Sequence, residues 1–395
     1  MNQLTPPKRR GNRFATDDIP PGRMGVRSGP KYAMRFETEP PYRHGSVPRT
    51  AVLLCNLGTP DAPTAPALRR YLAEFLSDQR VVEIPRLLWW PILHGIILRV
   101  RPKRSAAKYA SIWTPEGSPL LRWTLRQAQG LAQRLGPHVQ VHAAMRYGNP
   151  SVASQLEALR AEGVTRVLVL PAYPQYSGTT SASVADAVYQ WAARARWVPE
   201  LRFVNAYHDH PAYIDALAQR VQTHWAAHGR KAHLIMSFHG VPARTLEQGD
   251  PYHCQCHKTA RLLAERLGLA QADYTVTFQS RFGKAKWLEP YTEPTLVRMA
   301  QEGRTSAEVF CPGFTSDCLE TLEEIAMEVQ AAFREAGGTD FAYIEALNDA
   351  PAWLDALAAV ATQHMQGWPA HGHDDTSPEA RAAQREAALA MGANN

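Results

Sequence analysis

The sequence has no uninterrupted apolar run that approaches the ~18 residues of a membrane-spanning helix. Its first segment also lacks the apolar stretch of a secretory signal. Cysteine is scarce, with five among 395 residues, and an odd count without an export signal favours reduced thiols over a disulfide framework. These absences exclude an integral membrane protein and a disulfide-rich secreted protein, and we expect a cytosolic protein.

The chain also lacks a strong charge of either sign, since 43 basic and 37 acidic residues leave a formal charge of +6. Eight of the basic residues lie between Lys8 and Arg35. The excess therefore belongs to a leader and not to a nucleic-acid-binding face. No RNA- or DNA-binding motif is present, and we expect no nucleic-acid partner.

Both ends of the chain differ from its middle. Residues 1–48 are rich in Pro, Gly and Arg and have neither helix nor strand period, which predicts a disordered basic leader. Residues 366–395 are charged and Ala-rich without an apolar face, which predicts a flexible tail with at most a short exposed helix. The folded part should lie between these two segments.

Short apolar runs rich in β-branched residues alternate with helix-period segments in the middle of the chain. Such alternation indicates βαβ units, in which parallel strands are buried on both faces by helices. The predicted strands are 50–57, 139–145, 166–173, 201–207, 232–238, 274–278 and 307–312. The pattern predicts an α/β fold with parallel sheets.

An internal echo divides this middle into two similar units. "MRYGNP" and "SRFGK" each end a strand, and each is followed by a helical segment that closes in Glu-Gly and then by another strand. We therefore expect two similar domains, 49–190 and 191–365, each a parallel sheet flanked by helices, with a cleft between them.

A histidine, His239, ends the buried strand of "LIMSFHGVP". Ligands of open parallel sheets bind beyond the carboxyl ends of the strands, so a histidine there is a candidate for chemistry. The residues leave open the alternative that His239 only caps the strand by bonding to a backbone carbonyl.

A row of carboxylates follows the last of these predicted strands. On an α-helical wheel Asp317, Glu320, Glu324 and Glu328 share one face, opposite the apolar stripe Leu319, Leu322, Ala326 and Val329. One interpretation is a solvated face in which Asp317 caps the helix and Glu320 completes a capping box. The other is a track for a metal ion, because stacked carboxylates repel one another unless a cation neutralises them.

The motifs taken together resemble those of the ferrochelatases, in order, across residues 50 to about 350. They are "LCNLGTP", "SIWTPEGSPL", "MRYGNP", "PAYPQYSGTTSAS", "SFHGVP", "GDPYHCQC", "FQSRFGKAKWLEPYTE" and "CPGFTSDCLETLEEI". The resemblance implies two Rossmann-like domains that insert ferrous iron into protoporphyrin IX, the last step of haem synthesis. It places His239 and Glu320 at the active site, with Glu324 as a further metal donor and Glu328 continuing the path outward.

The chemistry agrees with these residue types. A porphyrin loses two pyrrolic N–H protons as the metal sheds water, so the site needs a base and a metal donor near the ring. Imidazole and carboxylate can serve either task for ferrous iron. The sequence leaves open which of His239 and Glu320 is the base and which is the ligand.

An apolar segment with basic flanks, residues 84–113, is predicted to form a lip over the porphyrin. Its apolar members are Trp89, Trp90, Ile92, Ile96, Ile97 and Leu98, followed by Arg99, Arg101, Lys103 and Arg104. The resemblance places Tyr109, Ser118, Arg146 and Tyr147 in or beside the pocket, and Leu57 is a further candidate contact. The lip also predicts a peripheral contact with a membrane surface; the alternative is an ordinary amphipathic helix packed on the core.

The cysteines bear on a cofactor. Cys254, Cys256, Cys311 and Cys318 could supply the four thiolates of a [2Fe–2S] cluster, which some ferrochelatases carry. Their C-x-C and C-x6-C spacing is not one that indicates a cluster, so we expect no required cofactor, with ferrous iron as a substrate. Cys318 stands where some relatives have histidine, which alters an outer metal ligand.

Two other functions stay open at this point. A sister chelatase would use coproporphyrin or another tetrapyrrole or metal, and the choice depends on propionate contacts that the sequence does not specify. A porphyrin or haem carrier would need the lip and one ligand but not a histidine opposed to Glu320.

Overall fold

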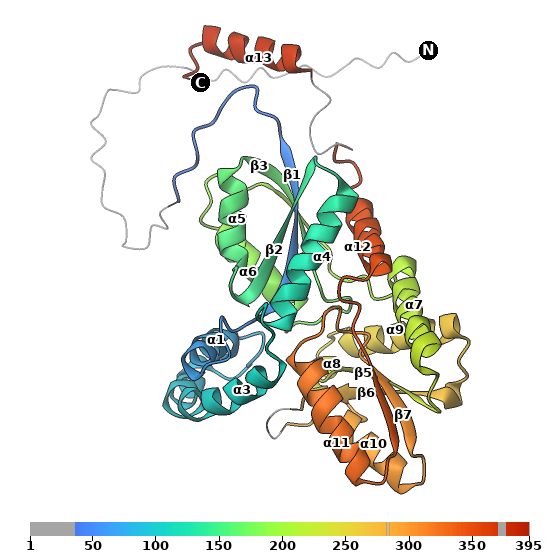
Figure 1. Cartoon of the computed structure of the whole chain (residues 1–395). Coiled ribbons are helices and arrows are strands. Elements are labelled where there is room, and N and C mark those ends of the chain that lie inside the picture. Colours follow the sequence, from blue (N-terminus) through green and yellow to red (C-terminus); the bar gives the residue numbers. More distant parts are fainter. Residues whose placement is uncertain (1–35, 282, 284, 370–376, 395) are drawn as a thin grey trace, which may run out of the picture. The chain divides into compact units, whose positions relative to one another are not determined.

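The computed structural model describes residues 36–281, 283, 285–369 and 377–394 (Figure 1). The predicted disorder of residues 1–35, and residues 370–376 and 395 of the predicted flexible tail 366–395, lie outside this range. Residues Glu37–Asn395 form one compact unit, and the description below concerns that unit.

The first sheet has four parallel strands in the order β2-β1-β3-β4. Alternate residues of β1 point to opposite faces, as a strand requires: Val52 and Leu54 pack with α4 and α12, whereas Leu53 and Cys55 pack with α5 and α6. The elements are β1 (Arg49–Thr59), β2 (Val139–Gly148), β3 (Val164–Pro171), β4 (Glu200–Phe203), α4 (Pro119–Leu135), α5 (Val152–Ala161), α6 (Ser181–Ala192) and α12 (Pro351–His364).

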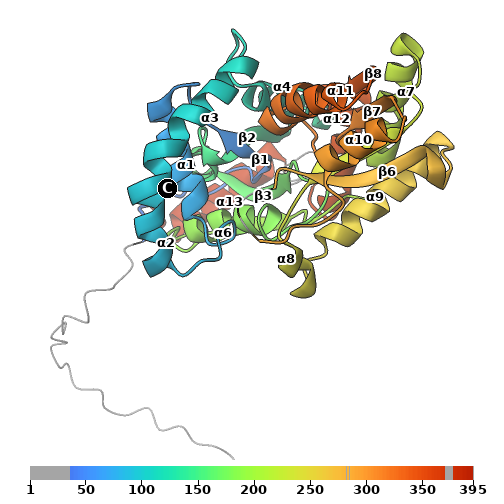
Figure 2. The same cartoon turned by 90° about the horizontal axis from the view of Figure 1, so that it is seen from below.

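The second sheet repeats this order as β6-β5-β7-β8, again parallel. Helices α7 and α9 cover one face, and α10, η3 and α11 cover the other (Figures 1 and 2). The elements are β5 (Leu234–His239), β6 (Tyr274–Gln279), β7 (Ser306–Phe310), β8 (Asp340–Ile344), α7 (Pro211–His228), α8 (Ala243–Glu247), α9 (Tyr252–Leu267), η2 (Gln271–Asp273), α10 (Thr292–Gln301), η3 (Glu320–Val329) and α11 (Gln330–Glu335). The matching orders confirm the predicted pair of similar α/β domains.

The division between the domains differs from the predicted boundary at residue 190. Strand β4 begins at Glu200 and pairs with β3 in the first sheet. Helix α12, from the predicted second domain, packs on α4 of the first so closely that a Cβ on Gly130 would lie 2.5 Å from Leu354 Cδ1. Strand β8 was not predicted, because its five residues, "DFAYI", form an edge strand with no fully apolar run. One hydrophobic core therefore spans both sheets.

The end of the predicted leader is ordered against the first domain, and the prediction of disorder up to residue 48 is wrong for these residues. The Glu39 carboxylate accepts hydrogen bonds from the backbone N–H groups of Arg196 (2.8 Å) and Trp197 (3.1 Å) and from Arg160 Nη1 (2.9 Å). Contacts of this kind, made by one half-buried carboxylate, are not visible in a Pro- and Arg-rich composition. At the other end, α13 (Pro378–Ala390) has no buried residue, as its lack of an apolar face predicts.

The predicted lip consists of three consecutive helical segments after α1. Figure 2 shows α1, α2 and α3 grouped together, and their bounds are α1 (Ala65–Ser77), α2 (Arg86–Ile92), η1 (Leu93–Ile97) and α3 (Leu98–Ile112). Trp89 and Leu93 are buried in a core that the lip shares with α1, whereas Leu87, Trp90 and Ile96 are exposed, Leu87 to 91%. The lip thus has apolar side chains both on its packed side and on its exposed side. Within the described residues no helix is long and apolar enough to cross a membrane.

Strand β7 carries a fully buried carboxylate that no site residue contacts. Glu308 Oε1 accepts a 2.7 Å hydrogen bond from Trp225 Nε1, and Oε2 has no hydrogen-bond partner among the described residues. Burial raises the pKa of Glu308 above its ordinary value of 4.5. The folded protein therefore holds this proton to higher pH than the unfolded chain, and stability falls as pH rises above 4.5.

We predict that Glu308→Gln raises the free energy of unfolding at pH 7 by about 1 kcal/mol, since the amide oxygen still accepts from Trp225 while the buried charge is lost. The gain should vanish below pH 4.5. Urea denaturation of both proteins between pH 4 and pH 8 measures it, with Glu302→Gln on the surface as a control of unchanged stability. A difference that is independent of pH would contradict the prediction.

Candidate active site

His239 ends β5 at the carboxyl edge of the second sheet, in register with Gln279 of β6. Its Nδ1 lies 2.6 Å from the carbonyl oxygen of Gly240, and because a carbonyl can only accept, Nδ1 carries the proton. The neutral ring then has its lone pair on Nε2. Tyr252 Oη donates to the His239 carbonyl (2.9 Å) and fixes the backbone. The predicted carbonyl cap is therefore present, yet it engages one ring nitrogen only.

Glu324 of η3 lies near enough to this histidine for their charges to interact. The backbone N–H of Ser280 donates to Glu324 Oε1 (2.7 Å), and the Ser280 hydroxyl donates to Oε2. Ser280 has a φ of +65°, a left-handed conformation that is costly for serine and that recurs at functional sites. Burial raises the pKa of Glu324, the charge of Glu320 raises it further, and the Ser280 bonds and His239 oppose the rise. The structure thus brings His239, Glu320 and Glu324 together.

The helix that carries these carboxylates is a π-helix, and this changes the predicted face. A π-helix closes hydrogen bonds from i to i+5, with about 4.4 residues per turn, so a spacing of four keeps residues aligned and a spacing of three does not. The buried residues of η3 are Thr321, Glu323, Ile325 and Val329. Of the predicted stripe only Val329 is buried, whereas Leu319, Leu322 and Ala326 are half-buried, so that stripe is wrong for these three residues. Glu320, Glu324 and Glu328 remain in one row, and Asp317 leaves it.

Asp317 is neither an exposed row member nor the cap of a capping box with Glu320. It is 4% exposed, and its carboxylate accepts hydrogen bonds from Tyr343 Oη (2.6 Å), Asn348 Nδ2 (2.7 Å) and Thr321 Oγ1 (3.0 Å). These partners come from β8, the loop after β8 and η3. Asp317 therefore fixes the start of η3 from within the core.

The outer carboxylates of η3 contact a lysine that the sequence analysis did not single out. Lys108 Nζ lies 2.7 Å from Glu328 Oε1 and 3.0 Å from Glu323 Oε1. Lys108 belongs to α3 of the lip, 220 residues from Glu328 in sequence. No local pattern in the chain reveals a pair at that separation.

A narrow pocket adjoins Glu320 and contains three of the five predicted porphyrin contacts. Leu57, Tyr109 and Ser118 line it together with Cys318 and Glu320. Its wall is fixed by the hydrogen bond between Thr59 Oγ1 and Ser118 Oγ (2.8 Å). Its volume for the centre of a water molecule is about 10 Å³, which holds about one water molecule.

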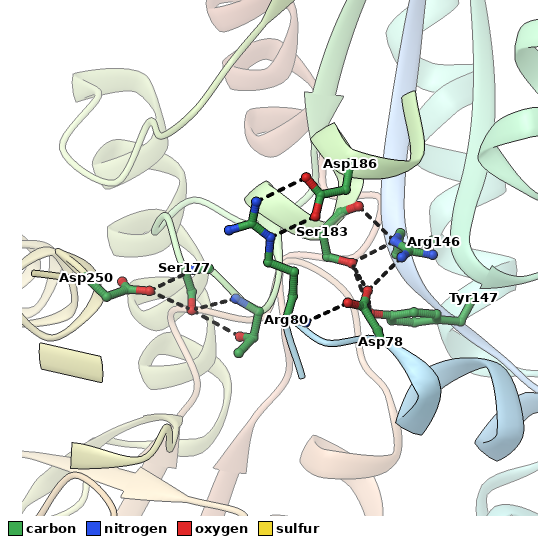
Figure 3. A network of polar contacts seen from close by, with 10 residues as sticks. Asp78, Arg80, Arg146, Tyr147, Ser177, Ser183, Asp186 and Asp250 are labelled. Atoms are coloured by element: carbon green, nitrogen blue, oxygen red, sulfur yellow. Dashed lines mark hydrogen bonds and ion pairs between the residues drawn. The ribbon is translucent and has the colours of Figure 1, made fainter. Parts of the chain in front are cut away.

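The other two predicted contacts, Arg146 and Tyr147, lie in a separate polar network around Asp78 (Figure 3). Asp78 Oδ2 accepts from Arg146 Nη2 (2.6 Å), Tyr147 Oη (2.8 Å) and Ser183 Oγ (2.5 Å). Burial opposes ionisation of Asp78 and would raise its pKa. The pKa is nevertheless below its ordinary value, because Asp78 accepts hydrogen bonds from Ser183, the Arg80 backbone and Tyr147 and lies beside the Arg146 charge. Sequence reasoning missed Asp78, which joins the end of α1 to β2 and α6.

The thiols are separate from one another. Cys55, Cys256, Cys311 and Cys318 are buried and Cys254 is exposed, and all five are free. Burial raises the pKa values of Cys311 and Cys318, so both are protonated at neutral pH. Within the part of the chain that the structure describes, no three His, Cys, Asp or Glu side chains lie close enough to hold a metal ion in their present positions.

The fold and site define a two-domain α/β protein with an imidazole and a row of carboxylates near the carboxyl edge of one sheet. Comparison with known proteins gives a family. The ferrochelatase family model matches residues 49–365. The ferrochelatase of Polaromonas sp. (strain JS666) is 67% identical, over 91% of this chain and 100% of that protein, and the ferrochelatase of Methylibium petroleiphilum is 63% identical, over 90% and 97%.

The chain therefore belongs to the ferrochelatase family, enzymes that insert iron into a porphyrin, and the predicted resemblance is confirmed. Among solved structures, the sirohydrochlorin chelatase SirB of Bacillus subtilis subspecies spizizenii with cobalt covers 80% of this chain and 97% of its own, at 11% identity and a TM-score of 0.48. The fold assignment rests on the strand orders above and not on this likeness.

The Asp78 network yields a stability prediction. Asp78→Asn leaves Arg146 without its nearly buried partner and should lower the free energy of unfolding by about 2–4 kcal/mol. Asp186→Asn, which breaks the more exposed pair with Arg80, should cost less than about 1 kcal/mol. Urea denaturation at pH 7 compares them, and equal costs would contradict the assignment. Because the folded pKa of Asp78 is lowered, its contribution should be lost as pH falls below the ordinary value.

Proposed function

We propose that this chain inserts ferrous iron into protoporphyrin IX to form haem, the last step of haem synthesis. The observation that carries the proposal is the single tautomer of His239, fixed by Gly240, beside the carboxylates Glu320 and Glu324 of η3. A carrier needs one axial ligand and has no use for two carboxylates at that place. We therefore prefer an enzyme.

His239 is the base in this proposal. Its Nε2 lone pair accepts one pyrrolic proton and releases it to solvent before it accepts the second. Its Nδ1–H is already engaged with a backbone carbonyl, so the ring keeps its orientation through the reaction. Glu320 and Glu324 deliver the ferrous ion, since carboxylates bind it without holding it as tightly as thiolates would. The Ser280 bonds keep Glu324 ready to accept a cation although it is largely buried.

The porphyrin lies beside Glu320 in this proposal, with Leu57, Tyr109 and Ser118 along one edge and Arg146 and Tyr147 at another. A macrocycle needs a cavity of several hundred Å³, far more than the narrow pocket offers. Binding therefore requires the lip to shift away from η3. The residues that bind the propionates determine whether the protein prefers protoporphyrin or coproporphyrin.

No resident cofactor is part of this proposal. The thiols that could form a [2Fe–2S] cluster are divided between α9 and the segment after β7, and burial raises the pKa of three of them, Cys256, Cys311 and Cys318. Ferrous iron is the substrate. Zinc should be accepted as well, because imidazole and carboxylate discriminate weakly among divalent first-row ions.

The lip supports a peripheral contact with a membrane surface and a cytoplasmic location beside it. Its exposed apolar side chains are Ile84, Leu87, Leu88, Trp90, Ile92, Ile96 and Val100, and arginines and lysines flank them in sequence. An apolar patch with basic neighbours is typical of surfaces that bind anionic membranes. Porphyrins partition into membranes, so a lip at that surface would receive its substrate there.

We predict that His239→Ala abolishes zinc and iron insertion, at least about a thousandfold, while protoporphyrin still binds, because the base is lost and the pocket remains. Glu320→Gln should reduce turnover strongly. Glu328→Gln, at the outer end of the row, should act mainly by raising the metal concentration needed for half-maximal rate. Anaerobic steady-state assays, with porphyrin binding followed by fluorescence quenching, measure these changes.

His208→Ala is the matched control, since His208 lies outside the site and should leave turnover near wild type. Unchanged turnover in His239→Ala would overturn the assignment of the base. Equal and negligible effects of Glu320→Gln and Glu328→Gln would mean that the row is only a polar face of the helix.

We predict that Leu87→Glu weakens binding to vesicles containing anionic lipid by about fivefold or more, because a charge replaces a side chain that would enter the membrane interface. Leu125→Glu on α4, where Leu125 is also exposed, should not change binding. Vesicle co-sedimentation measures both. Equal vesicle binding by wild type and Leu87→Glu would remove the lip as the contact.

A further inference from the structure

Lys108 links the lip to the helix that carries the carboxylates. Its ammonium group contacts two η3 carboxylates at once, Glu328 at 2.7 Å and Glu323 at 3.0 Å. Its neighbour in sequence, Tyr109, lines the pocket beside Glu320. One turn of α3 therefore touches the outer end of the carboxylate row and the porphyrin side of the site.

The two outer carboxylates need a cation. The Glu323 side chain is 11% exposed, and Lys108 Nζ lies 3.0 Å from its Oε1. Without the lysine, two carboxylates would face each other with one of them nearly buried, which is unfavourable unless another cation replaces it. A divalent metal ion is such a cation, and carboxylates are ligands that it accepts.

We propose that Lys108 is a positioning residue that occupies the outer carboxylates as a built-in counter-ion, which the incoming ferrous ion displaces. The inference rests on the proposed function, in which Glu320, Glu324 and Glu328 form the metal path. Displacement of Lys108 releases the contact between α3 and η3, so metal uptake at the surface loosens the lip. Lys108 acts through Glu323 and Glu328 and does not touch the reacting atoms.

The test compares Lys108→Gln with Lys108→Arg in steady-state zinc insertion at saturating protoporphyrin. The glutamine variant removes the competing charge and should lower the metal KM by about three- to tenfold, with kcat within about twofold of wild type. The arginine variant keeps the charge and should keep the wild-type KM. A merely structural lysine would change kcat or stability and leave the metal KM alone.

Two further variants separate charge competition from a loose lip. Glu83→Gln breaks an ion pair with Arg244 at the residue that precedes the lip, without touching η3, and should leave the metal KM unchanged. In a Glu328→Gln background the effect of Lys108→Gln should shrink to less than about twofold, because the contested carboxylate is gone. Zinc binding to the free protein, measured by calorimetry, should tighten in Lys108→Gln and not in Glu83→Gln.

An unchanged or raised metal KM in Lys108→Gln, with wild type active and His239→Ala inactive, would overturn this inference and leave the proposed function standing. The inference would also be overturned if Lys108→Gln changed the metal KM equally in the wild-type and the Glu328→Gln backgrounds. Absence of metal insertion by the wild type would instead overturn the proposed function, and the calorimetric comparison would still decide whether Lys108 competes with metal.

Discussion

The site depends on holding five carboxylates close together within residues 317–328 in spite of their mutual repulsion. Each has a different means of neutralisation or support. Asp317 is held by donors from β8 and its following loop, Glu324 by the two donors of Ser280, and Glu323 and Glu328 by Lys108. Glu320 faces the pocket instead, where a substrate metal would meet it. The π-helix makes this arrangement possible, because residues four apart, Glu320, Glu324 and Glu328, lie in one row along it.

The architecture around this segment follows from a repeated βαβ pattern that the sequence displays openly. One of the two similar motifs, "MRYGNP", ends β2, and the other, "SRFGK", follows β6. Strands β2 and β6 occupy the same position in their sheets. Alternating apolar strands and the place of His239 at a strand end were sufficient to predict the fold class and the edge where the site lies. The family resemblance then assigned residues along that edge, and the structure brings His239, Glu320 and Glu324 together there.

What the sequence did not predict has physical causes. The prediction assumed an α-helix, with about 3.6 residues per turn, whereas η3 is a π-helix with about 4.4. The apolar period does not distinguish the two, so the buried face of η3 was predicted wrongly. The partners Asp78, Lys108 and Ser280 act across sequence separations of 68, 220 and 44 residues, and no local pattern encodes such pairs. Strand β8 and the contacts of Glu39 were missed because short edge strands and polar arms gain their order from the surface they meet.

His239 and the carboxylates of η3 are proposed to form a catalytic site and not a binding site alone. The most direct measurement is multiple-turnover haem formation by the purified chain, with ferrous iron and protoporphyrin IX in excess under anaerobic conditions and coproporphyrin in a parallel reaction. We expect many haem molecules per protein molecule and a faster reaction with protoporphyrin. Tight porphyrin binding without metal insertion would contradict it, and a clear preference for coproporphyrin would contradict the substrate assignment.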